Sequence, residues 1–189
     1  VNSYKNFDGI IRAGFNISNI GPKMKYSKVN GGTESYIPTN LRLGSGFEFI
    51  FDGNNSLAVT LEINKLLVPS PSEEVLNVNG EVVAYRQPDV GFLAGIFKSF
   101  GDAPDGIAEE IKELTYGLGL EYSFNKSFFL RSGYFSEHEL KGSRKFVTIG
   151  TGFMTSRNLN VDLSYLISTS DVISPLENTI RLSLGFNFN

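Results

Sequence analysis

The clearest pattern in the chain is the alternation of apolar with polar or small residues in its last stretch. Because side chains of a β-strand point in turn to its two faces, the pattern predicts a strand with one apolar and one polar face. A soluble sheet contains such strands, and so does a membrane barrel, where the apolar face meets lipid. The apolar positions are Ile180, Leu182, Leu184, Phe186 and Phe188, and between them lie Arg181, Ser183, Gly185 and Asn187.

Seven earlier segments repeat this alternation, so we expect eight strands. Segments of about ten residues suit a tilted strand that crosses a bilayer and exceed the usual length in soluble sheets. The fifth segment is the least regular, with Leu130 and Tyr134 expected to face outward and Arg131 and Gly133 inward. The predicted segments are 10–19, 40–51, 57–64, 116–124, 128–136, 147–153, 159–167 and 178–188.

The links between these segments alternate between short and long. Outer-membrane barrels have short periplasmic turns and long extracellular loops, and the chain ends on the periplasmic side. A β-sandwich has no reason to alternate in this way, so the pattern favours an all-β, antiparallel transmembrane β-barrel. The short links are 52–55, 125–126 and 156–158, and the long ones are 20–39, 65–115, 137–145 and 169–177.

Composition narrows the function classes. The chain has no cysteine, which excludes disulfides, thiolate nucleophiles and cysteine metal sites. A net charge of −3 with dispersed signs indicates no nucleic-acid partner. No apolar run approaches the roughly 18 residues of a membrane-spanning helix, so a membrane form would have to be a barrel. The chain opens at Val1 without a signal peptide, and we expect either a mature protein or a piece of a longer one.

The faces predicted to point inward carry both charge signs and many glycines. Mixed charge argues against an ion-selective pore, whose wall would carry one sign. Glycine either leaves room for another segment of backbone in a filled, salt-bridged lumen or relieves crowding in a curved wall. Both interpretations remain open. The inward charged residues are Arg12, Arg42, Arg131 and Arg181 with Glu48, Glu62, Glu121 and Asp162.

The insertion 65–115 is far longer than an ordinary loop and is predicted to contain two helices. The first lies near 92–100, and the second runs over 105–114 with Asp105 as its cap and with Ile107, Ile111 and Leu114 on one face. The helices either cover the barrel mouth with their apolar side chains packed down, or bind a partner protein. The candidate partner-binding residues are Phe92, Leu93, Ile96, Phe97, Phe100, Ile107 and Ile111.

No enzymatic chemistry is predicted. His138, the single histidine, lies between Glu137 and Glu139 in a charged segment, where a solvated loop is the better interpretation than a metal site. The glycine pairs lie within strands rather than before helices, so they form no phosphate-binding loop. The chain has no G-x-S-x-G sequence. We therefore expect no catalytic residue, no cofactor and no metal.

Five strings, spread over nearly the whole chain, resemble the PorV family, also called LptO. The resemblance implies a FadL-like barrel of about fourteen strands when complete. Residues 1–189 would then be the C-terminal portion of this single barrel domain, without its first strands and an N-terminal segment in the lumen. The strings are Phe15-Asn-Ile-Ser-Asn-Ile-Gly21, Tyr36-Ile-Pro-Thr-Asn-Leu-Arg42, Asn64-Lys-Leu-Leu-Val-Pro69, Leu130-Arg-Ser-Gly-Tyr-Phe135 with Glu137-His138-Glu139, and Pro175-Leu-Glu-Asn-Thr-Ile-Arg-Leu-Ser183.

The resemblance also implies a function. PorV is a non-enzymatic component of the type IX secretion system in the outer membrane of Bacteroidota. It binds the C-terminal domain of secreted cargo at the SprA (Sov) translocon and shuttles the cargo to an attachment complex that contains PorU. The extracellular loops would make these contacts, and outer-membrane lipid would surround the barrel. The alternative is a FadL-type transporter of hydrophobic small molecules, which predicts an apolar pocket inside the barrel.

Overall fold

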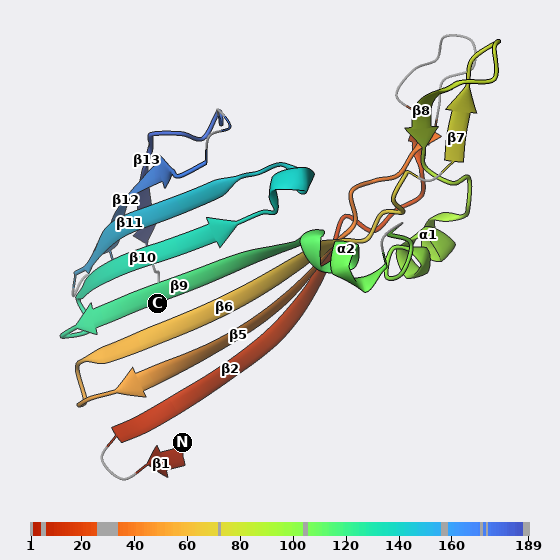
Figure 1. Ribbon diagram of the computed structural model, residues 1–189. Coiled ribbons are helices and arrows are strands. Elements are labelled where there is room, and N and C mark those ends of the chain that lie inside the picture. The colour runs from red at the N-terminus through yellow and green to blue at the C-terminus, as the bar shows by residue number, and fades with distance from the viewer. Residues whose placement is uncertain are drawn as a thin grey trace. The chain divides into compact units, whose positions relative to one another are not determined.

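A computed structural model describes residues 2–4, 7–25, 34–71, 73–103, 106–155, 159–170, 172 and 174–186. Its main element is a nine-stranded sheet with strand order β1-β2-β5-β6-β9-β10-β11-β12-β13 (Figure 1), and every pair with a defined register is antiparallel. The strands are β1 (Asn2–Tyr4), β2 (Phe7–Ser18), β5 (Asn40–Ile50), β6 (Ser56–Leu66), β9 (Leu114–Phe124), β10 (Phe128–Ser136), β11 (Lys145–Met154), β12 (Leu159–Ser168) and β13 (Thr179–Phe186).

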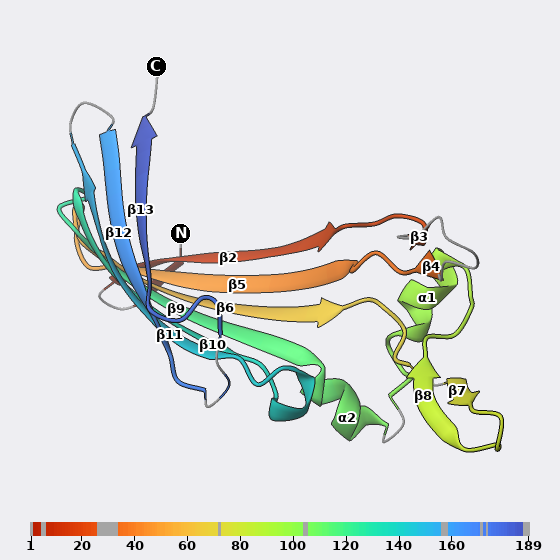
Figure 2. The ribbon, with the colours of Figure 1, turned by 90° about the horizontal axis from the view of Figure 1, so that it is seen from above.

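The fold class predicted from the sequence is confirmed at the level of an all-β antiparallel sheet. Each of the eight predicted segments is a strand of this sheet, and β1 is an additional short strand. The strands of the sheet twist progressively from β9 to β13, as Figure 2 shows. No helix among the described residues is long and apolar enough to span a membrane.

The chain separates into two compact units. The first comprises residues 1–14, 43–63 and 115–189, and the second comprises 15–42 and 64–114. The second unit contains two hairpins that the sequence analysis missed, as well as the helices. Its elements are β3 (Met24–Lys25) paired with β4 (Glu34–Ser35), β7 (Glu73–Leu76) paired with β8 (Val82–Arg86), and helices α1 (Phe92–Lys98) and α2 (Ile107–Lys112).

The second predicted helix is shorter than expected. It begins at Ile107 with Gly106 as its N-cap and has no side-chain capping hydrogen bond, so the predicted start at 105 is wrong. Asp105 itself lies outside the described residues. Leu114 is the first residue of β9 rather than part of the helix, because the strand pairing begins there.

The alternation of short and long links is confirmed where the structure describes them. Asn125 and Lys126 both have positive φ, 50° and 52°, which is the backbone of a two-residue hairpin turn. In the turn before β6, one carboxylate oxygen of Asp52 accepts hydrogen bonds from the Asn54 and Asn55 amides, both at 2.8 Å. The Lys126 amide donates to the Asn54 carbonyl at 3.0 Å, which ties these two short turns together. The predicted turn 156–158 lies outside the described residues.

The sheet is inverted relative to a soluble protein, because its apolar face is the exposed one. Along β9, Leu118 and Leu120 are exposed, whereas Gly119 and Glu121, which alternate with them, are half-buried. Across β12 and β13, the exposed Leu163 and Leu182 lie directly opposite each other. A soluble sheet buries this face against a second layer. The buried hydrophobic residues in the described part of the chain are Leu67, Ala103 and Phe146.

The polar face carries ion pairs that join neighbouring strands. The Arg131 Nε lies 2.5 Å from a Glu121 carboxylate oxygen, and an Nη of the same guanidinium contacts Asp162. Near the other edge of the sheet, Arg12 and Glu48 lie 2.7 Å apart. The polar face is therefore salt-bridged, and that it points into a lumen stays a prediction.

Glycine on this face makes room for neighbouring side chains. A Cβ added at Gly152 would meet the Asp162 carboxylate and the Arg131 guanidinium, and one added at Gly133 would meet the Thr148 hydroxyl. The interpretation that glycine relieves crowding in the wall therefore holds at these positions. Whether a further segment of chain fills the lumen stays a prediction.

Replacing Leu182 with arginine should lower the free energy of unfolding in a bilayer by about 2–4 kcal/mol if the site lies near the midplane. The physical cause is the insertion of a charge on the face that we expect to meet lipid. The measurement is denaturant unfolding of the full-length protein folded in lipid vesicles. Ser183→Arg is the matched control, because Ser183 lies on the polar face opposite Asp162. Equal effects of the two changes would show that the facing assignment is wrong.

Candidate partner-binding site

The predicted partner-binding residues lie on and beside the two helices of the long loop. Leu93 and Phe97 are exposed to 56% and 77% and lie one turn apart on α1. Ile107 and Ile111 are exposed to 81% and 54% and lie one turn apart on α2. Phe100, just beyond α1, is also exposed. We call Leu93, Phe97, Phe100, Ile107 and Ile111 the apolar loop patch.

The two remaining predicted residues, Phe92 and Ile96, are half-buried. They are therefore left out of the apolar loop patch, and their part in partner binding stays a prediction. The helix turns different apolar side chains toward its support and toward the surface.

Helix α1 is held against its support by its smallest residues. Gly95 and Ser99, four positions apart, are buried. A Cβ added at Gly95 would lie 2.8 Å from a ring carbon of Tyr36 and 3.2 Å from Cγ of Pro69, closer than such atoms pack. At this glycine, therefore, α1 touches the loop before β5 and the loop after β6. This close approach leaves the larger side chains Leu93 and Phe97 on the open side.

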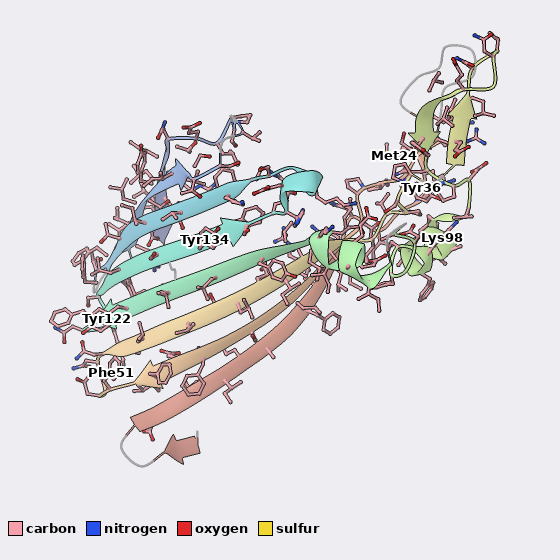
Figure 3. The ribbon with its side chains drawn as sticks, in the orientation of Figure 1. Met24, Tyr36, Phe51, Lys98, Tyr122 and Tyr134 are labelled. Atoms are coloured by element: carbon pink, nitrogen blue, oxygen red, sulfur yellow. The ribbon has the colours of Figure 1, made fainter. Side chains whose placement is uncertain are left out.

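Tyr36 also fastens the segment that leads into α1 (Figure 3). Its hydroxyl lies 2.8 Å from the Pro88 carbonyl and 2.9 Å from the Val90 carbonyl, so that it donates to this stretch of backbone. The Lys23 ammonium lies 4.5 Å from the centre of the Tyr36 ring and 2.6 Å from the Asp89 carboxylate. Two loops that are distant in the sequence are joined by this cation–π contact and ion pair.

The pKa values of Lys23 and Asp89 shift in the directions expected for an ion pair. The hydrogen bond to Asp89 raises the pKa of Lys23, and the same bond lowers the pKa of Asp89. Asp89 is fully exposed, so its contribution to stability is screened by solvent. We therefore regard the Tyr36 contacts as the principal fastening of the segment before α1.

A cluster of charged and polar side chains anchors α2. The Lys65 ammonium, at the end of β6, lies 2.6 Å from Glu110 and 3.1 Å from Glu113. Ser70 donates its backbone amide to Asp102 at 2.9 Å and its hydroxyl to Glu113 at 3.0 Å. We call Lys65, Ser70, Asp102, Glu110 and Glu113 the Lys65 cluster. Its hydrogen bonds join four separate stretches of the second unit.

The loop between β10 and β11 is closed by a bidentate ion pair and a short 3₁₀ helix, η1 (Glu139–Lys141). Arg144 donates from Nε and an Nη to the two oxygens of Glu137, at 2.7 and 2.9 Å. This pairing lowers the pKa of Glu137. His138 is exposed beside it, and the described residues contain no group of three or more side chains arranged to hold a metal ion. The Arg144–Glu137 pair therefore holds charged side chains in a fixed position in this loop.

The polar and apolar faces of the sheet each have a shallow hollow. The hollow among the polar positions has a volume of about 560 Å³, and its lining includes Glu121, Arg131, Asp162 and Arg181. The second, of about 550 Å³, has Leu120 and other apolar side chains in its lining. Leu120, Ile149 and Leu163 line both hollows, whereas Glu121 and Asp162 line only the first. These charged groups do not suit a hydrophobic ligand.

Adding a methyl group at Gly95 should loosen α1, because the new Cβ would press on Tyr36 and Pro69. Hydrogen exchange or proteolysis over residues 92–98 should be faster in Gly95→Ala than in the parent protein. Gly91→Ala is the control, since a Cβ there meets nothing within 4 Å. Alanine generally favours helix by about 1 kcal/mol over glycine, so a more protected α1 in Gly95→Ala would refute the close contact.

The first part of the chain matches a known protein family. Residues 1–73 of the 189 match the family described as type IX secretion system protein PorV. No curated protein matches the chain. PorV is a family of secretion-system proteins of the outer membrane and is not an enzyme family. The matched range includes the first three sequence strings that suggested PorV. The predicted resemblance to PorV is therefore confirmed over residues 1–73.

Proposed function

We propose that this protein is a non-enzymatic, multi-pass β-barrel component of the type IX secretion system in the outer membrane. In this proposal it captures the C-terminal domain of secreted cargo at the SprA (Sov) translocon. It then carries the cargo to the attachment complex that contains PorU. The observation that carries the proposal is the exposure of the apolar loop patch on an insertion that has its own fixed structure.

The sheet supports the membrane part of the proposal. Its apolar face is exposed along β9, β12 and β13, as a surface in lipid requires. Neighbouring strands of the sheet pair through their backbones. Crossing hydrocarbon without helices also requires that the sheet close into a barrel, and this closure is part of the proposal. Lipid would therefore cover the face that no protein layer covers in the described part of the chain.

The long loop supports the binding part. Exposed aromatic and aliphatic side chains act as anchors when a partner covers them and excludes water. Phe97 and Leu93 project from a helix that Gly95 and Tyr36 hold in place. A prearranged surface loses less conformational entropy on binding than a flexible one, which favours affinity. The patch consequently has the composition and the support of a protein-binding surface.

The transporter alternative receives less support. It requires an apolar pocket among the inward positions, whereas the hollow there includes the charged residues Glu121, Arg131 and Asp162 in its lining. The second hollow has Leu57 and Tyr122 in its lining, but Arg131 lines it as well. The shuttle remains the better interpretation.

A photo-crosslinking residue at position 97 of the full-length protein in intact cells tests this proposal directly. We expect crosslinks to secreted proteins that share the type IX C-terminal domain, or to the translocon. Crosslinks confined to the protein itself would contradict the proposal and favour the transporter. Position 78 is a suitable control for the crosslinker, because Val78 is fully exposed in the same insertion but lies outside the apolar loop patch.

Replacing Phe97 with glutamate should reduce cargo capture, since a charge would have to be desolvated at the centre of the contact. Secretion and surface attachment of cargo are the measurements, with the amount of folded barrel as the reference. Val78→Glu is the matched control and should leave secretion unchanged. Normal secretion by the Phe97 variant would remove α1 from the binding site.

A further inference from the structure

The Lys65 cluster contains more negative than positive charge. Its three carboxyl groups are those of Asp102, Glu110 and Glu113, and its one ammonium group, that of Lys65, contacts the two glutamates. The Lys65 side chain is 8% exposed, and those of Glu110 and Glu113 are each 14% exposed. Lys65 contacts both glutamates, so each of them has a counter-ion at hydrogen-bonding distance. Charge in such a poorly solvated place is costly unless it is paired.

Asp102 is the member with an unsatisfied atom. One of its oxygens accepts the Ser70 amide at 2.9 Å, whereas the other, Oδ1, is buried without a hydrogen-bond partner in the described part of the chain. A buried acceptor without a donor is unfavourable, and more so when it is charged. A proton on Oδ1 would remove the negative charge and turn the unsatisfied acceptor into a donor.

The surroundings of Asp102 act in the same direction. Burial raises the pKa of Asp102, the negative charges of Glu110 and Glu113 add to the rise, and the Ser70 amide opposes it. A group whose pKa is higher in the folded state stabilises that state when it is protonated. This contribution is lost as the pH rises through the folded-state pKa.

We propose that Asp102 is a proton-sensitive clamp that fixes α2 to the end of β6 and to the segment around Ser70. With Asp102 protonated, the Lys65 cluster holds together and α2 stays ordered. With Asp102 ionised, repulsion from Glu110 and Glu113 loosens α2, and the exposed Ile107 and Ile111 lose their fixed support. The charged groups that act on Asp102 are Glu110 from α2 and Glu113 from its C-cap, and Lys65 from β6 pairs with both of these glutamates. The clamp is a property of this loop and does not depend on which partner binds it.

Hydrogen exchange of the full-length protein in lipid vesicles, over a pH range that starts below the ordinary pKa of an aspartate, tests the clamp. In the parent protein, protection of residues 106–113, corrected for the intrinsic exchange rate, should fall as the pH rises. In Asp102→Asn this dependence should be lost and protection should stay high. The asparagine carbonyl can accept the Ser70 amide, and its NH₂ group can supply the missing donor. A flat profile in the parent, or an unchanged dependence in Asp102→Asn, would overturn the proposal.

A second variant separates the clamp from a general effect of pH. Glu113→Gln removes one of the negative charges that oppose the ionisation of Asp102, so the loss of protection should move to lower pH. Asp89→Asn, which changes a carboxyl group of the same insertion that is paired with Lys23, should leave the midpoint where it is. A midpoint unchanged by Glu113→Gln would contradict the clamp even if Asp102→Asn failed to fold.

Discussion

The constraint on which the structure depends is that no described part of the chain covers the apolar face of its sheet. Alternating positions such as Leu118, Leu120 and Leu182 are exposed, while the ion pairs of Arg131 lie on the other face. In water this arrangement would cost about 25 cal/mol for each Å² of apolar surface left uncovered. In lipid the cost disappears, and strand pairing satisfies the backbone. The glycines of the polar face and the short turns between strands are consistent with an apolar face that meets lipid.

The same constraint favours the proposal that the long links carry the function. Strands in a membrane must keep their alternation, so they have little freedom to form a binding site, whereas loops on a rigid scaffold have much. Here the insertion between β6 and β9 is itself held rigid. Gly95 brings α1 close to Tyr36, and the Lys65 cluster fixes α2. The fastening lets large apolar side chains such as Phe97 stand at the surface in a defined arrangement.

Much of the sheet could be predicted from the sequence, because a period of two over about ten residues is a strong local signal. The signs of the inward charges were also visible, but the Arg131 pairs with Glu121 and Asp162 depend on strand register. The β7–β8 hairpin has a local signal in Asn79-Gly80, a dipeptide typical of hairpin turns, but Glu81 interrupts the apolar alternation beside it. The Lys65 cluster and the Tyr36 contacts join residues that lie up to 54 positions apart, and no local pattern reveals such contacts. The exposure of Phe97 likewise depends on how α1 packs against Tyr36 and Pro69, which no local pattern reveals.

The most direct test of the inverted sheet is a single-cysteine scan along β9, which is clean because the chain has no cysteine of its own. Spin labels at positions 117 to 122 of the full-length protein in lipid vesicles would be compared for access to oxygen, which concentrates in lipid, and to a water-soluble nickel complex. Access to oxygen should peak at 118, 120 and 122, and access to nickel should be higher at 117, 119 and 121. Uniform access to nickel, or the opposite alternation, would contradict a lipid-facing apolar surface.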